Sequence, residues 1–147
     1  MLRQISQQIA VSLSKNGYIL SIQSNFPKGG SLNITDISIC LDCSFVSQVN
    51  NNLISNAVRY AKSAIKITYT CSKEGFYLTV SDDGCGFSKE ALCKATNPYF
   101  TGENHREHFG LGLYICKILC EHHGGYLKIE NCSTGANATA FFKSLDL

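Results

Sequence analysis

Three polar side chains, Asn52, Asn56 and Arg59, are spaced so that they can act together on one side of a helix. At 100° per residue they form a stripe about 60° wide, bordering the face on which Leu53 and Tyr60 would lie. A single amide in such a place is usually just solvated. Amide oxygens suit Mg²⁺ and a guanidinium group suits phosphate, so the aligned trio favours a cleft that holds a metal ion and a phosphate.

A second polar group stands where an apolar strand is expected to end, in "SDDGCGF", residues 81–87. Asp-Gly is common in ordinary turns, and the motif alone favours that interpretation. The alternative is a carboxylate, Asp83, that accepts a hydrogen bond from a ligand amino group such as that of a purine. Gly84 and Gly86 would then let the ligand lie against bare backbone.

A third feature is the glycine pair in "HFGLGLYICKILCEHHGG", residues 108–125, where an amphipathic helix begins. A loop that needs positive φ angles explains an isolated pair of glycines. The alternative is an anion close to the backbone, because a helix N-terminus presents free N–H groups and the positive end of its dipole. The other motifs decide between the two.

The helices and strands that must position these groups can be expected from the pattern of apolar residues. Their order predicts an α/β fold class, a two-layer α+β sandwich. Helices are expected at 1–16, at 45–62 and after the glycine pair; alternating strands are expected at 18–26, 34–42, 64–71, 76–83, 125–131 and 138–145. The sum is a mixed, mostly antiparallel sheet of about five strands with three helices on one face. Residues 87–109 lack a sustained period, and a loop of that length indicates a functional lid.

Composition limits the classes of function. The 147 residues fit one domain, 1–147, and a net charge of +2 is too small for a protein that grips nucleic acid or an anionic membrane. No run of 18 apolar residues occurs, and the N-terminus does not resemble a signal peptide. "CLDC" at 40–43 has zinc-knuckle spacing but lacks a second ligand pair, so the eight cysteines favour reduced thiols and a cytoplasmic setting.

In this order the motifs resemble those of the ATP-binding catalytic domain of bacterial sensor histidine kinases, in the Bergerat-fold superfamily that also contains gyrase, mismatch-repair ATPases and the ninety-kilodalton chaperones. "NNLISNAVRYA" resembles the N box, "DDGCGF" the first glycine box, "NPYFTG" the lid box and "FGLGLYICK" the second glycine box. The resemblance spans essentially the whole chain, and four ordered motifs make it specific.

The resemblance implies a role for each site residue, with ATP and Mg²⁺ as cofactors. Asn56 would bind Mg²⁺, Asn52 would support the phosphates, Arg59 would neutralise their charge and Tyr60 would flank the nucleotide. Asp83 would accept from the adenine amino group. The other implied nucleotide contacts are Gly84, Gly86, Phe87, Gly110, Leu111, Gly112, Leu113 and Thr139.

Four positions depart from the family pattern. His108 and Asn137 stand where glycine is usual, and Thr96 and Tyr99 replace phenylalanines of the lid box. These changes are expected to leave binding intact.

The resemblance also implies a reaction. Hydrolases of the superfamily carry a glutamate where this chain has Asn52, and an amide cannot take a proton from water. A histidine on a separate dimerisation domain would therefore accept the γ-phosphate and pass it to a response regulator. The isolated chain would be a monomer, and the full-length protein a membrane-anchored homodimer with this domain in the cytoplasm. The alternatives are an anti-sigma-factor serine kinase and a nucleotide-binding pseudokinase.

Overall fold

The computed structural model describes residues 19–25, 41–72, 74–101 and 110–144, with backbone only for 19–25. Five strands form one sheet in the order β1-β2-β3-β5-β4. They are β1 (Ile19–Asn25), β2 (Ala64–Cys71), β3 (Gly75–Asp82), β4 (Tyr126–Asn131) and β5 (Ala136–Lys143). β1 pairs with β2 in parallel and the other pairs are antiparallel, which confirms the predicted mixed sheet.

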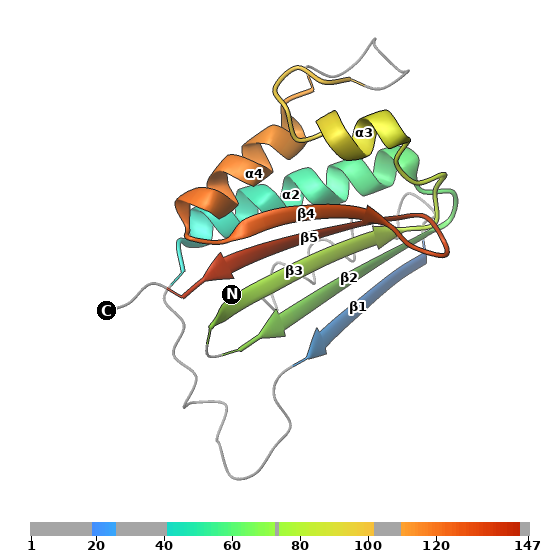
Figure 1. The fold of residues 1–147 in the computed structure, drawn as a ribbon. Coiled ribbons are helices and arrows are strands. Elements are labelled where there is room, and N and C mark those ends of the chain that lie inside the picture. Colours follow the sequence, from blue (N-terminus) through green and yellow to red (C-terminus); the bar gives the residue numbers. More distant parts are fainter. Residues whose placement is uncertain (1–18, 26–40, 73, 102–109, 145–147) are drawn as a thin grey trace.

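Three described helices lie on the same side of the sheet (Figure 1). They are α2 (Cys43–Tyr60), α3 (Lys89–Lys94) and α4 (Gly112–His122), of which α2 and α4 pack against the sheet. The Asp42 carboxylate caps α2 by accepting from the backbone N–H groups of Ser44 and Phe45 at 2.9 and 3.3 Å. The helix predicted at 1–16 and most of the strand predicted at 34–42 lie outside the described residues.

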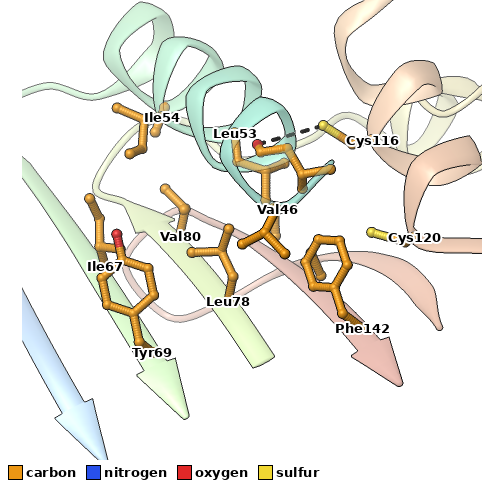
Figure 2. Packing of buried hydrophobic residues seen from close by; sticks show 14 of the residues in the cluster. Val46, Leu53, Ile54, Ile67, Tyr69, Leu78, Val80, Cys116, Cys120 and Phe142 are labelled. Carbon is orange, nitrogen blue, oxygen red and sulfur yellow. Dashed lines mark hydrogen bonds between the residues drawn. The ribbon is translucent and has the colours of Figure 1, made fainter. Parts of the chain in front are cut away.

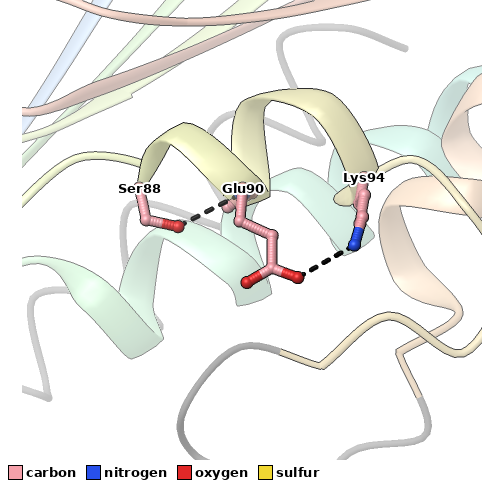
Figure 3. A network of polar contacts seen from close by, with 4 residues as sticks. Ser88, Glu90 and Lys94 are labelled. Carbon is pink, nitrogen blue, oxygen red and sulfur yellow. Dashed lines mark hydrogen bonds and ion pairs between the residues drawn. The ribbon is translucent and has the colours of Figure 1, made fainter.

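The predicted lid contains a helix that periodicity did not reveal. The Ser88 hydroxyl accepts from the Ala91 backbone N–H at 3.1 Å, and Glu90 pairs with Lys94 at 3.0 Å across one turn (Figure 3). These are local signals, because α3 buries no residue and shows no apolar face to count. The prediction that 87–109 is mostly loop is therefore wrong for Lys89–Lys94, while residues 102–109 lie outside the described part.

The core fills the space between α2, α4 and the sheet (Figure 2). Alternate residues of each central strand face the helices, as in the buried positions of β3 and β5: Phe76, Leu78, Val80, Ala136, Ala138, Ala140 and Phe142. The intervening side chains lie on the opposite face of the sheet. This alternation decides which polar residues can reach a site under the helices. No described helix is long and apolar enough to span a bilayer.

Candidate functional site

Asp82 is the acid that β3 directs toward the helices. It is the last residue of the strand, it alternates in register with Val80, and only 6 % of it is exposed. Its Oδ1 accepts from the Gly84 backbone N–H at 2.8 Å, and the Ala136 N–H also donates to the carboxylate. Burial raises its pKa, which these donors partly oppose. A buried carboxylate thus lies at the glycine-rich turn.

Two glycines make room around Asp82. A Cβ at Gly84 would lie 2.7 Å from the Asp82 Oδ1 and would overlap the carbonyl oxygen of Tyr60. A Cβ at Gly135 would overlap the carbonyl oxygen of Asp82. The C-terminal end of α2, the turn after β3 and the turn before β5 therefore meet at this carboxylate, and only glycine fits at both contacts.

Asp83 has a different environment. Its carboxylate accepts from the backbone N–H groups of Lys62 at 2.8 Å and Ser63 at 3.0 Å, and from the Ser63 hydroxyl at 2.7 Å. These bonds hold its pKa well below the usual range. The carboxylate that was predicted to receive adenine is thus occupied in fastening the end of α2 to the end of β3, and the geometry favours Asp82 instead.

Gly86 and Phe87 are held against β4 by Asn131. The Asn131 Oδ1 accepts from the Phe87 N–H at 2.7 Å, and its Nδ2 donates to the Phe87 carbonyl at 2.8 Å. Gly86 has φ 76°, and a Cβ there would lie 2.8 Å from the same amide oxygen. Asn131 was missed by sequence reasoning; its place at the end of "YLKIEN", before a turn, was the available signal.

The predicted stripe on α2 lies at the edge of the core. Asn52 and Asn56 are half-buried, whereas Arg59 and Tyr60 are exposed. The Arg59 guanidinium lies 5.8 Å from the centre of the Tyr60 ring, within the range of a cation–π contact. The carbonyl of Tyr60 touches the Gly84 turn, so the structure brings this end of the stripe beside Asp82.

The glycines of "GLGL" serve two different purposes. Gly110 has φ 66°, and a Cβ there would lie 2.5 Å from the Phe100 carbonyl oxygen, so this position requires glycine for backbone reasons. Gly112 begins α4 and has open space where a Cβ would stand. Leu111 provides no side-chain cap, and Leu113 is half-buried against the core. The first turn of α4 therefore leaves room for an external acceptor.

Thr139 is not brought to this site. It alternates with the buried Ala138 and Ala140, so it lies on the face of the sheet opposite the helices, where its hydroxyl is 3.2 Å from that of Thr79. Asn137 lies on that same face and accepts from the Ser81 hydroxyl. The buried residues of β5 nearest this end of β3 are Ala136, beside Asp82, and Ala138, opposite Val80, and their methyl groups offer no hydrogen bond.

Among the described residues, no group of three or more His, Cys, Asp and Glu side chains could hold a metal ion. The oxygens available to a cation near the stripe are the amide oxygens of Asn52 and Asn56. They fit Mg²⁺, which prefers hard oxygen ligands, keeps several waters and takes further oxygens from a bound triphosphate.

Comparison with known proteins agrees with this arrangement. Residues 42–146 match the model of the family described as "Histidine kinase-, DNA gyrase B-, and HSP90-like ATPase". An NtrY-like sensor histidine kinase of Rickettsia bellii (strain RML369-C) is 36% identical over 107 residues, 70% of this chain and 17% of that protein. The sensor histidine kinase CpxA of Escherichia coli (strain K12) is 32% identical over 88 residues, 57% of this chain and 19% of CpxA.

Solved structures show the same fold. The nucleotide-free catalytic domain of the histidine kinase ThkA has a TM-score of 0.77 and 23% identity, with 97% of this chain and 90% of that one covered. Full-length ShkA has a TM-score of 0.73 and 19% identity, with 99% of this chain and 30% of that one covered. The chain thus spans about a fifth of the length of the two curated relatives. It belongs to the family of histidine kinase-, DNA gyrase B- and HSP90-like ATPases.

Proposed function

We propose that residues 1–147 form one catalytic domain that binds Mg-ATP and donates the γ-phosphate to a histidine on a separate dimerisation domain of the full-length sensor kinase. The observation that carries the proposal is the buried Asp82 carboxylate at a turn where glycines keep the backbone bare. Burial raises its pKa, and the amino group of adenine would supply a further donor to the charged form. The ShkA structure was solved with AMPPNP, which supports nucleotide binding by this fold.

The remaining residues of the site have roles that follow from their chemistry. Asn56 would offer its amide oxygen to Mg²⁺, and Arg59 would neutralise the phosphates while Tyr60 flanks the nucleotide. The open first turn of α4 at Leu111 and Gly112 would donate backbone N–H groups to phosphate. Residues 87–109 would close over the triphosphate.

The reaction moves one phosphoryl group from ATP to an imidazole nitrogen of the acceptor and leaves ADP. Bound Mg²⁺ would neutralise the charge that develops on the phosphates, and the chain's own residues position the reactants. Asn52 cannot act as a general base, so water is a poor acceptor and the histidine brings its own basic nitrogen. A response regulator would then receive the phosphate, and this domain would lie in the cytoplasm.

The test compares two neighbouring substitutions in nucleotide binding. Asp82→Ala should weaken ATP and ADP binding more than tenfold, because losing a hydrogen bond to a charged acceptor costs about 1.5–3 kcal/mol. Asp83→Ala should lower the melting temperature and leave the affinity of the folded protein within about threefold. Calorimetry would measure the affinities of the unsubstituted chain, Asp82→Ala and Asp83→Ala for ATP, ADP and GTP. Equal affinity of the unsubstituted chain for ATP and GTP would contradict the adenine site, and a larger binding loss in Asp83→Ala would restore the original assignment.

A further inference from the structure

Asn131 links the edge strand β4 to the glycine-rich turn after β3. Its side-chain Oδ1 accepts from the Phe87 backbone N–H at 2.7 Å, and its Nδ2 donates to the Phe87 carbonyl at 2.8 Å. An N–H group can only donate and a carbonyl can only accept, so these two contacts fix which end of the amide faces which backbone atom. The side chain therefore pairs with the backbone of Phe87 as a residue of a neighbouring strand would.

The backbone that carries this amide is itself fixed by the sheet. Asn131 is the last residue of β4 and pairs with Ala136 of β5. Directly after it, the Cys132 N–H donates to the Gly135 carbonyl at 2.9 Å and closes the turn between the two strands. A side chain on a paired strand end is positioned more precisely than one on an unpaired loop. The β4–β5 hairpin therefore provides a rigid support for the turn that contains Gly86.

The end of this hairpin contacts both parts of the proposed adenine site. At one side, a Cβ at Gly86 would lie 2.8 Å from the Asn131 Oδ1, so the amide lies directly against the bare backbone of the glycine. At the other side, a Cβ at Gly135 would overlap the carbonyl oxygen of Asp82 and would lie 2.8 Å from the Gly84 nitrogen. The same hairpin end thus touches the residue that carries the buried carboxylate and the glycine that would lie under the base.

We infer that Asn131 is a positioning residue that holds the backbone of Gly86 at a fixed place relative to the Asp82 carboxylate, and so sets the affinity of the site for the base of the nucleotide. The inference rests on the proposed function, in which the carboxylate accepts from the adenine amino group and Gly86 lies under the ring. ADP and ATP share the adenine, so both should bind more weakly without the Asn131 amide. The gain in affinity that Mg²⁺ gives should remain, because the proposed Mg²⁺ ligand Asn56 lies on α2.

Asn137 supplies a matched control on the same hairpin. It lies on β5, pairs with Glu130, and its side-chain oxygen accepts from the Ser81 hydroxyl on the face of the sheet opposite the helices. Asn131→Ala and Asn137→Ala therefore remove the same atoms from neighbouring strands, and each variant loses side-chain hydrogen bonds. Only Asn131→Ala removes the contacts with Phe87.

The first experiment measures binding of ADP and of a non-hydrolysable β,γ-imido ATP analogue by calorimetry, with Mg²⁺ and with a chelator. Asn131→Ala should weaken binding of both nucleotides about three- to tenfold, the effect of one lost hydrogen bond, and leave the Mg²⁺-dependent gain within about twofold. Asn137→Ala should leave both affinities within about twofold. On a Gly86→Ala background, Asn131→Ala should add less than about twofold, because the added methyl group already displaces the turn from the amide.

The second experiment uses the nucleotide-free protein, so that failure of the proposed function is distinguishable from failure of this inference. In ¹⁵N-labelled protein, Asn131→Ala should hasten exchange of the Phe87 amide proton with water and leave that of Leu78, within β3, unchanged, whereas Asn137→Ala should change neither. Unchanged exchange at Phe87, equal losses of affinity in the two alanine variants, or a loss confined to the ATP analogue would overturn the inference. An unsubstituted chain that binds neither nucleotide, while Asn131→Ala still hastens exchange at Phe87, would refute the proposed function alone.

Discussion

The adjacent aspartates at the end of β3 show how backbone alternation gives one residue type two electrostatic environments. Asp82 faces the helices, where burial raises its pKa, and Asp83 faces the turn after α2, where three donor groups lower its pKa. Burial disfavours the ionised form of Asp82, and a ligand that donates a hydrogen bond to the carboxylate would stabilise that form. An ionised Asp83 already has its donors, which favours a role in folding over one in binding.

The Asp83 contacts predict a pH-dependent contribution to stability. A carboxyl group whose folded pKa is depressed stabilises the fold above its unfolded pKa, near 3.8, and this stabilisation is lost as the pH falls toward the folded pKa. The melting temperature of Asp83→Asn should therefore lie furthest below that of the unsubstituted chain at pH 6–7. The difference should shrink below pH 4, where the native aspartate also protonates.

Thermal melts of both proteins from pH 7 to pH 2.5 would measure this difference. Comparing the two proteins at each pH removes the similar contribution of Asp42, whose pKa is also lowered by its capping bonds. A difference that stays constant across the range would show that the Asp83 charge does not stabilise the fold.

At the scale of residues, the motifs could be predicted from the sequence. The structure was needed to show which side chain of each motif faces the helices. "SDDGCGF" indicated a carboxylate at a glycine turn, but which acid faces the helices depends on the strand register, and a shift of one residue reverses the answer. The face on which Thr139 lies has the same cause, since it alternates with the buried Ala138 and Ala140 and pairs with Thr79 on the face opposite the helices. Asn131 contacts a distant segment through Phe87, which no local pattern reveals.

At the scale of elements, His123 fastens three of them together. It caps the end of α4 and is almost fully buried. Its Nε2 accepts from the Asp42 backbone N–H at 2.9 Å, at the start of α2, and its Nδ1 lies 2.9 Å from the Lys143 carbonyl at the end of β5. Because a carbonyl can only accept, the ring must be the neutral form with its proton on Nδ1.

His123→Ala should therefore lower the free energy of unfolding by about 2–4 kcal/mol, because two backbone groups lose their partner and an apolar contact with Phe142 is lost. The neighbouring His122 is exposed and contacts only the ring of Phe45 among the described aromatic residues. His122→Ala should cost less than about 1 kcal/mol. Urea unfolding of both variants measures the two values, and equal losses would show that the three-way contact adds nothing.

The elements themselves were largely predictable, for a physical reason. α2, β2, β3 and β5 bury one face each, and in β4 the apolar Leu127 and Ile129 are half-buried beside exposed residues, so apolar periodicity marks all five in the sequence. α3 buries nothing and shows no such pattern. The contacts of His123 could not be predicted, because the sequence does not show that the start of α2 and the end of β5 come together there.

At the scale of the whole molecule, the proposed function places nucleotide binding away from the two histidines that the structure describes. The proposed phosphate end of the site lies at the first turn of α4, and His122 lies at the last turn, about 15 Å away along the helix axis at 1.5 Å per residue. His123 has both ring nitrogens engaged. Neither histidine can therefore reach a γ-phosphate held at the first turn of α4. Phosphoryl transfer requires the attacking nitrogen to lie in line with the bond that breaks.

The isolated 147 residues should therefore bind Mg-ATP, incorporate negligible phosphate and hydrolyse ATP slowly, since Asn52 cannot activate water. Adding a helical hairpin that carries an acceptor histidine, in the same chain or separately, should restore acid-labile, alkali-stable label on the hairpin. Incubation with γ-labelled ATP, followed by acid and alkali treatment, distinguishes the outcomes. Acid-stable label on a serine of an added partner would identify a serine kinase instead. Robust acid-labile label on these 147 residues alone would contradict the separation of the two sites, because one of the chain's own histidines would then reach the γ-phosphate.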